Sequence, residues 1–329
     1  MLPIRSLPIA ALAVPLILVA CGGGDDDGGT VTPEGTHHQY VVSKATVIPA
    51  APHTPDEPGY GLDLGSRTSA TLDGRIDNSL GKALAILASV NTALDGQATL
   101  DTAVNQGSVI LLVDFQSKDF MNSNAGFAIK FGASPNPPAC SGASDTTCGH
   151  HLMGGASFQL ASNSPSGDVT GKLASGVFDG GPGELSLQIT IGSTTPILLP
   201  LVHARVKVTS VSETSLKALV GGLITAQDLK TNVGGALEGP VTQLLAGACT
   251  ELMPPNPPNC GCTGLAMQLM SLIDGDTGTA RDCKITGEEI LANPATSSST
   301  TPDGCSMDTC TAPDALSVGI NIEAVAATF

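Results

Sequence analysis

Two acidic loops hold the residues whose types and spacing are most suited to chemistry. The first runs from Asp274 to Glu289 and follows the pattern of an EF-hand loop, which places oxygen ligands at positions 1, 3, 5, 7, 9 and 12. Oxygen ligands in this number favour calcium, a hard cation. Compared with the EF-hand pattern, the loop has four extra residues between Asp276 and Asp282. The alternative interpretation is therefore an acidic turn anchored by a disulfide. With Glu289 at position 12, the other ligands are Asp274, Asp276, Asp282, the carbonyl of Lys284 and Thr286.

The second acidic loop lies before a predicted helix. It contains Leu72-Asp73-Gly74-Arg75-Ile76-Asp77-Asn78, in which Asp73 and Asp77 match the middle of a calcium loop. Asp63 would supply the first ligand across an insertion. The alternative is structural, because Asp77 or Asn78 can cap a helix after an Asp-Gly turn. Both interpretations stay open from the sequence.

A cysteine near the N-terminus points to a different chemistry. Cys21 follows Leu18-Val19-Ala20 at the end of an apolar run that begins at Ile9, and Arg5 is the single charge before it. The run is too short to span a bilayer and suits the core of a signal peptide. Lipoprotein processing needs a cysteine as the first mature residue, because its thiol carries the diacylglycerol. We therefore expect residues 1–20 to be a lipoprotein signal peptide and Cys21 to be lipidated; the alternative is an uncleaved hydrophobic anchor.

The expected location follows from this signal. Two or three acyl chains hold a mature lipoprotein to a membrane almost permanently, whereas one chain binds only marginally. Either form of the N-terminus places the body of the protein outside the cytoplasm, in a bacterial cell envelope. Gly22 stands where an aspartate signals inner-membrane retention in enteric bacteria, which favours the outer membrane. The membrane, reached through the lipid anchor, is the expected partner.

The eight other cysteines form an even set, as an oxidising compartment predicts. Cys140 and Cys148 enclose a short polar loop and are the obvious local pair. A zinc site at Cys260-Gly261-Cys262 is the alternative, but its spacing is wrong for a zinc knuckle and it needs free thiolates. We expect disulfides among Cys140, Cys148, Cys249, Cys260, Cys262, Cys283, Cys305 and Cys310.

Composition excludes several classes of partner. The chain has 30 acidic and 14 basic side chains, and this negative charge repels nucleic acid and favours divalent cations. It has no tryptophan, and aromatic residues make up 3% of it, so a lectin or a single-strand-binding protein is disfavoured. The 39 glycines and 23 prolines indicate a turn-rich β protein. A protein or small-molecule ligand stays open.

The chain divides into three parts. After the signal peptide, residues 21–58 begin with a glycine- and aspartate-rich run and contain few apolar side chains, so we expect a flexible acidic, proline-rich tether. His37 and His38 lie within it and are expected to be solvated. Residues 59–329 are expected to form a single β-rich domain, with a helical, cysteine-rich insertion at about 226–312.

Short alternating segments predict the fold class. We expect strands at 109–115, 125–131, 157–161, 169–178, 185–191, 197–208 and 216–224, and a last strand from 316 to 322. Apolar residues at three- and four-residue spacing predict helices from Asn78 and around 265–273, and Thr225 can cap another. The expected fold is mainly β, an antiparallel sandwich or curved sheet, with the helical insertion before a C-terminal strand.

Four segments carry a resemblance to known sequences. They are Leu72-Asp-Gly-Arg-Ile-Asp-Asn-Ser-Leu-Gly81, Leu198-Leu-Pro-Leu-Val-His-Ala-Arg205, Asp282-Cys-Lys-Ile-Thr-Gly-Glu-Glu-Ile290, and the ending from Pro313 to Phe329. In these segments the chain resembles uncharacterised predicted lipoproteins of myxobacteria and related bacteria, over most of the mature sequence. Both acidic loops of those relatives are closer to uninterrupted calcium loops, so the resemblance implies calcium binding and no particular activity. The insertions in this chain depart from that pattern.

No sequence motif identifies an enzyme. The chain has no nucleophile elbow, no His-Glu-x-x-His helix, no Walker loop and no dinucleotide fingerprint. His150 and His151 are the loose catalytic candidates, because they follow Cys148 in a loop. We expect a lipid-anchored extracytoplasmic protein with a structural or ligand-binding role and calcium-stabilised loops. The alternative is a cell-envelope hydrolase or metal-dependent enzyme without a recognisable motif.

Overall fold

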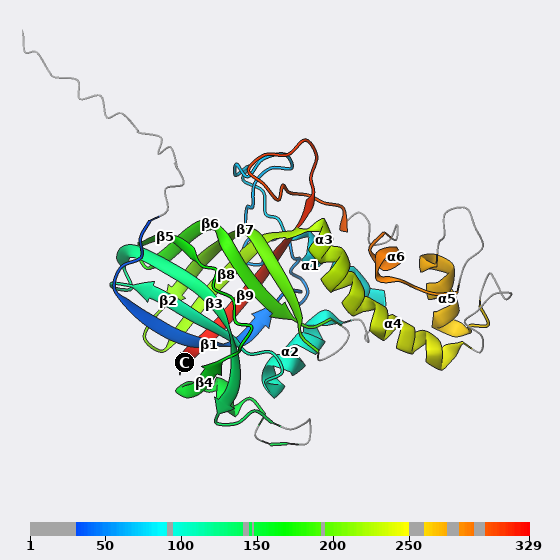
Figure 1. The fold of residues 1–329 in the computed structure, drawn as a ribbon, viewed down its shortest axis with the longest axis horizontal. Coiled ribbons are helices and arrows are strands. Elements are labelled where there is room, and N and C mark those ends of the chain that lie inside the picture. Colours follow the sequence, from blue (N-terminus) through cyan, green and yellow to red (C-terminus); the bar gives the residue numbers. More distant parts are fainter. Residues whose placement is uncertain are drawn as a thin grey trace, which may run out of the picture.

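The core of the protein is a closed sheet of eight antiparallel strands, a barrel (Figure 1). The computed structural model describes residues 31–90, 95–140, 145–146, 148–191, 195–249, 260–274, 283–292 and 300–329. The predicted mainly β fold with a curved antiparallel sheet is confirmed. In order around the barrel, the strands are β1 (Thr36–Thr46), β2 (Leu111–Ser117), β3 (Asn122–Asn136), β5 (Val169–Ala174), β6 (Val177–Ile189), β7 (Ile197–Val211), β8 (Ser215–Thr225) and β9 (Ala315–Thr328).

The barrel closes because its first and last strands pair. β9 lies antiparallel to β1, and β3 pairs directly with β5. The remaining strand, β4 (Ala156–Leu160), lies outside the barrel and pairs with the ends of β3 and β9. Every strand of the barrel wall therefore has a partner on both sides, so the wall has no open edge.

Apolar side chains fill the interior of the barrel. Alternate residues of a strand point inward, so β2 buries Val113 and Phe115 while β3 buries Phe127 and Ile129. Phe115 meets Phe178 of β6 edge-on, with ring centroids 5.6 Å apart and an interplanar angle of 84°. Eight strands enclose a space that side chains just fill. Since full burial of one such side chain stabilises by about 1.5–3 kcal/mol, this core is a main source of stability.

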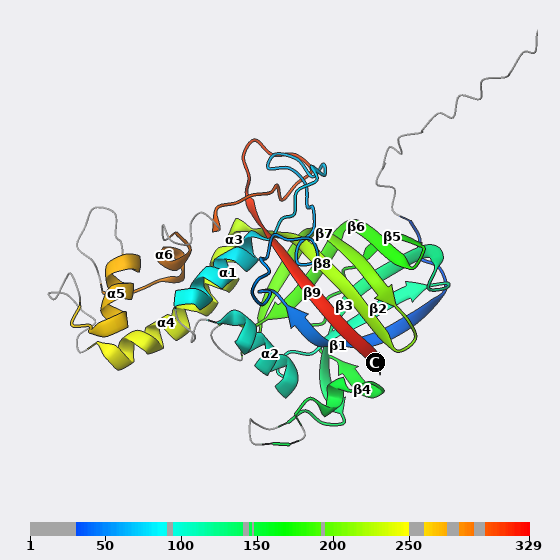
Figure 2. The ribbon, with the colours of Figure 1, turned by 180° about the vertical axis from the view of Figure 1, so that it is seen from behind.

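The two ends of the barrel are built differently. β1 starts at one end, which we call the short-turn end, and alternating strand directions place three brief connections there. These connections are residues 118–121, 175–176 and 212–214. The opposite, long-connection end carries residues 47–110, 137–168, 190–196 and 226–314. Figure 1 shows the helices gathered toward the long-connection end, and the view from behind in Figure 2 agrees.

Two helices lie in the connection between β1 and β2. α1 (Ser79–Val90) starts where the pattern from Asn78 predicts a helix. α2 (Gly96–Gln106) was not predicted, because few apolar residues mark its buried face. Its start is fixed by Asp95, whose side chain accepts hydrogen bonds from two backbone N–H groups of the first turn. Gly107 ends it in the left-handed conformation that glycine favours, with φ at 72°.

The helical segment predicted as an insertion lies between β8 and β9, and these two strands pair with each other along all of β8. Thr225 caps the segment as predicted, because its Oγ1 accepts the Asp228 N–H at 3.1 Å. The helices are α3 (Ala226–Asp228), the π-helix η3 (Leu229–Gly234), α4 (Gly235–Ala248), α5 (Gly264–Ile273) and α6 (Gly287–Ala292).

The prediction of a flexible tether over residues 21–58 is wrong for Thr36–Thr46. These residues form β1, which lies between β2 and β9. Tyr40, Val41 and Val42 are buried. This apolar run is short and has polar neighbours, so the local composition does not reveal that pairing on both sides will bury it.

The same strand changes the setting of His37 and His38, which were predicted to be solvated in a linker: both lie in β1 and not in a linker, although His37 is exposed as expected. Nδ1 of His37 lies 2.8 Å from Oδ1 of Asp114 on β2. The ring of His38 packs beside Phe120, with centroids 4.5 Å apart. Both histidines therefore belong to the barrel wall.

Candidate functional site

The eight cysteines predicted to be oxidised form four disulfides, which confirms that prediction and excludes the zinc alternative at Cys260-Gly261-Cys262. Each disulfide joins two residues of the same long connection, and no barrel strand contains a cysteine. The predicted lipidation site, Cys21, lies outside the described residues. The four pairs are Cys140–Cys148, predicted from the sequence, Cys249–Cys262, Cys260–Cys283 and Cys305–Cys310.

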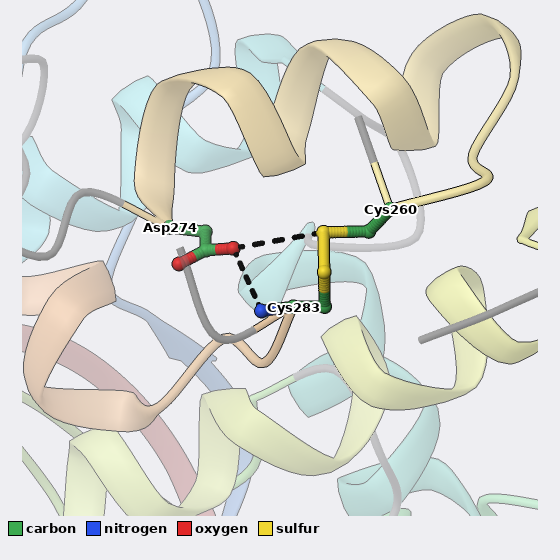
Figure 3. A group of neighbouring side chains, drawn as sticks. All are labelled: Cys260, Asp274 and Cys283. Atoms are coloured by element: carbon green, nitrogen blue, oxygen red, sulfur yellow. Dashed lines mark hydrogen bonds between the residues drawn. A yellow bond between two sulfur atoms is a disulfide. The ribbon is translucent and has the colours of Figure 1, made fainter. Parts of the chain in front are cut away.

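Asp274, the first predicted calcium ligand, lies against a disulfide (Figure 3). Its side chain is fully buried after α5, and Oδ2 accepts the Cys283 N–H at 3.1 Å and lies 4.0 Å from Cys260 Sγ. Among the described residues, these three are the one group of potential metal ligands whose ligand atoms lie within 4.8 Å of one another. Because both sulfurs belong to one disulfide, the group does not offer the oxygen donors that calcium takes.

The later part of the first acidic loop forms a helix cap. Thr286 Oγ1 accepts the Glu289 N–H at 3.3 Å, and Glu289 Oε2 accepts the Thr286 N–H at 2.7 Å. This reciprocal pair is a capping box at the start of α6. Lys284 is exposed, and Asp276 and Asp282 lie outside the described residues. Two predicted ligands thus bind each other, and calcium binding at this loop stays a prediction.

The second acidic loop is held by its own carboxylates. Asp63 accepts three backbone N–H groups, the shortest at 2.6 Å from Gly74. Asp73 Oδ2 lies 2.7 Å from Arg75 Nη2, and this hydrogen-bonded ion pair holds the pKa of Asp73 below its usual value. The ligand atoms of Asp63, Asp73 and Asp77 do not all lie within 4.8 Å of one another. This arrangement does not fit a calcium cage, and binding there also stays a prediction.

Asn78 caps α1, as the structural alternative predicts. Its Oδ1 accepts the N–H of Gly81 at 3.1 Å and the N–H of Gly319 on β9 at 2.9 Å. Its Nδ2 donates to the carbonyls of Pro55 at 3.2 Å and Tyr60 at 2.9 Å. Asn78 is fully buried, so these bonds are not shared with water. One side chain thus joins the loop before α1, the helix itself and β9.

A cleft of about 420 Å³ opens where this loop meets α1 and the segment that precedes β9. The volume is within the range of small-molecule sites. The cleft belongs to the long-connection end, and Ile76 is the one large apolar residue among the described residues that line it. Charged residues of both signs line the cleft: Asp56, Asp77 and Asp303, and Arg67, Arg75 and Lys82.

Asp77 has the perturbed pKa expected of a functional carboxyl. Burial raises its pKa to about 6, against the lowering effect of the Leu64 N–H, which Asp77 Oδ2 accepts at 2.9 Å. The negative charges of Asp303, Asp63 and Asp73 raise it further. A carboxyl in a cleft that changes charge near neutral pH is a candidate for binding or proton transfer.

Asp303 is a further carboxylate of the cleft, and it was not predicted from the sequence. Its Oδ2 accepts the hydroxyls of Ser79 and Ser317, both at 2.6 Å, and its Oδ1 accepts the Ser317 N–H at 2.8 Å. Ser79 and Asp303 are 224 residues apart, so no local pattern could bring them together. The one signal was an Asp-Gly pair shortly before the predicted last strand.

The basic residues of the cleft differ in their partners. Lys82 Nζ lies 3.0 Å from Asp56 Oδ2, and Arg75 pairs with Asp73 as described above. Arg67 is exposed, and its guanidinium makes no ion pair with any residue that the structure describes. The cleft therefore offers one cationic group that the described part of the chain does not neutralise.

The histidines considered for catalysis lie in another connection. His150 and His151 form η2 (His150–Leu152) between β3 and β5. His151 is fully buried with its ring centroid 6.4 Å from that of Phe158, and burial lowers its pKa, which favours the neutral ring. The buried ring of His151 is out of reach of substrate, and His150 is exposed but does not line the open cleft, which is the better candidate site.

Comparison with protein-family models, with curated proteins and with solved structures finds no match. The resemblance to myxobacterial lipoproteins therefore stays a prediction. Within the described residues, no helix is long and apolar enough to span a membrane.

Proposed function

We propose that the chain is a lipid-anchored extracytoplasmic protein that binds a small polar ligand in the cleft of Asp77 and Asp303. One observation carries this proposal: the start of the first strand and the cleft lie at opposite ends of the barrel. β1 begins at the short-turn end, and Cys21 precedes it in the sequence. The cleft belongs to the long-connection end. A protein held at the first end presents its cleft away from the membrane.

The lengths involved support this orientation. Fifteen residues lead from Cys21 to Thr36, and such a segment reaches at most about 50 Å when fully extended. A strand rises about 3.3 Å per residue, and strand tilt shortens this rise along the barrel axis, so the wall adds a smaller further distance between the anchor and the cleft. A soluble ligand could therefore reach the cleft without entering the lipid headgroups.

The disulfides support a location outside the cytoplasm. Four disulfides account for every cysteine except Cys21, and such bonds persist in oxidising compartments. They hold the long connections that build the cleft end, whereas the hydrogen-bonded barrel wall needs none. An oxidising compartment therefore suits the long connections, because they contain the four disulfides.

Acyl labelling tests the anchor. We expect wild type to incorporate labelled palmitate and to fractionate with membranes, and Cys21→Ala to remain unlabelled. Fractionation is expected to place the protein in the outer membrane. Proteolysis of intact cells then distinguishes a surface-facing protein, which is cut, from a periplasmic one, which is protected. An unlabelled wild-type protein in the cytoplasmic fraction would contradict the proposal.

A hydrolase is the second candidate, because paired carboxylates with one raised pKa are typical of acid–base catalysis. Binding is favoured over hydrolysis because Asp303 accepts three hydrogen bonds from Ser79 and Ser317, which leave it little capacity to exchange protons. A hydrolase screen tests this choice: an activity present in wild type and abolished in Asp77→Asn would favour the enzyme.

A further inference from the structure

Some of the charged residues that line the cleft have no ion-pair partner within the described part of the chain. Lys82 and Asp56 neutralise each other, and Arg75 pairs with Asp73. Asp77 and Asp303 accept hydrogen bonds from neutral groups only and make no ion pair with a described residue, and neither does Arg67. Two carboxylates and one guanidinium of the cleft thus have no ion-pair partner among the described residues, although Arg75 lies near enough to Asp77 for their charges to attract.

We propose that the cleft binds a small zwitterion of the α-amino-acid class, with its ammonium group toward Asp77 and Asp303 and its carboxylate toward Arg67. This inference rests on the proposed ligand-binding function and names its ligand class. A primary ammonium has three N–H donors and can serve two carboxylates at once. The planar guanidinium of arginine binds a carboxylate through two parallel hydrogen bonds.

The shape and lining of the cleft favour this class over others. A volume of about 420 Å³ accommodates a small ligand, and the described lining offers Ile76 as its one large apolar surface. No aromatic residue is among the lining residues, so a nucleobase or a sugar would have no ring on which to stack. The recognition available is polar and charged, which suits a compact zwitterion.

A divalent cation fits less well. Calcium takes six to eight oxygen ligands at about 2.3–2.6 Å. Three of the roughly four acceptor positions of Asp303 already receive protein donors. Asp77 and Asp303 do not join a third described carboxylate in a group of ligand atoms within 4.8 Å. Arg67, which lines the same cleft, would also repel the ion, whereas it attracts the anionic half of a zwitterion.

Isothermal titration calorimetry on the purified full chain tests the proposal. The probes are L-alanine and L-glutamine as zwitterions, L-alaninamide as a cation alone, propionate as an anion alone, and calcium chloride. We expect saturable binding of a zwitterion and no comparable binding of the other three. Because each charged hydrogen bond contributes substantially, Arg67→Gln and Asp77→Asn should each weaken binding about tenfold or more.

A matched variant controls for nonspecific effects. Asp179→Asn removes a carboxylate exposed on β6, outside the cleft lining, and should bind like wild type. Arg67 is exposed, so Arg67→Gln remains informative if Asp77→Asn does not fold. The proposal is overturned if neither zwitterion saturates, if L-alaninamide binds as well as L-alanine, or if Arg67→Gln binds unchanged.

The outcomes separate this inference from the function on which it rests. A protein acylated at Cys21 that binds calcium or a neutral molecule in the cleft retains the proposed function and overturns the zwitterion. Zwitterion binding in an unacylated cytoplasmic protein supports the ligand class and overturns the anchor.

Discussion

The two ends of the barrel differ in the length of their connections and in the features that those connections contain. At the short-turn end, the chain reverses direction within a few residues, and no cysteine or cleft residue lies in those turns. At the long-connection end, the chain makes all four disulfides, the α-helices and the charged cleft. The barrel wall thus provides stability through its apolar core and through strand pairing that leaves no open edge. The cleft is built from the connections outside the wall.

The largest effect is expected from replacing Asn78, which joins the loop before α1 to β9. Asn78→Ala should lower the free energy of unfolding by about 3 kcal/mol or more, because it leaves several buried backbone groups without partners. Denaturant unfolding measures the loss. Asn321→Ala, on β9, removes one exposed hydrogen bond to the Gly59 carbonyl and should lower the free energy of unfolding by about 1 kcal/mol or less. Equal losses in the two variants would show that Asn78 is not a special link.

Removal of disulfides should weaken one end and spare the wall. The pair Cys260→Ala with Cys283→Ala opens a loop of sequence separation 23 and should cost about 3 kcal/mol. Cys305→Ala with Cys310→Ala opens a separation of 5 and should cost about 2 kcal/mol. Limited proteolysis should then cut within residues 226–314, while the amide hydrogens of the wall keep their slow exchange. Faster exchange throughout the barrel would contradict the division between the ends.

The pH dependence of stability should report on the cleft. The pKa of Asp77 is raised from 3.8 to about 6, so the folded protein binds this proton more tightly than the unfolded chain. Stability from this group therefore increases as the pH falls from about 6 toward 4, and decreases as the pH rises through that window. Asp77→Asn should remove this component and raise the melting temperature at pH 7. Melting curves of wild type, Asp77→Asn and Asp179→Asn from pH 4 to 8 measure it; identical slopes in all three would refute the assignment.

Calcium should have the smallest effect. The described carboxylates of both acidic loops already accept protein donors, so their geometry does not depend on an ion. We expect calcium bound at either predicted loop to raise the melting temperature only slightly above its value in chelator. A clear increase with calcium, lost in Asp63→Asn, would restore the second loop as a calcium site. An increase that survives in Asp63→Asn and is lost in Glu289→Gln would instead restore the first.

Much of the wall could be predicted from the sequence, because strands with one buried face alternate in hydrophobicity. Phe127, Ile129 and Phe131 in β3 show the pattern plainly. Closure into a barrel could not be predicted, since it depends on β1, whose apolar residues are few and lie in a polar segment. Its burial is a property of the pairing with β2 and β9, which the local composition does not contain.

The candidate site was predictable in part. The Asp-rich segment ending at Asn78 was recognised as functional or structural, and its capping role is confirmed. The position of Asp303 could not be predicted. It lines the same cleft as Asp77 only because β9, which follows it in the sequence, returns to the barrel. The same limit applied to Cys260 and Cys283, whose pairing depends on how α5 and α6 pack.

The pairing of β1 with β9 also sets when the molecule can fold. Ser43 of β1 donates to the carbonyl of Glu323, 280 residues later in the chain. Contacts of such high sequence separation slow folding, because closing a long loop costs chain entropy before the contact can stabilise the fold. Until its last strand is synthesised, the chain exposes the open edges of β1 and β8, which invite pairing with other chains. β9 therefore acts as a seam, because its pairing with both β1 and β8 removes the last two open edges of the sheet.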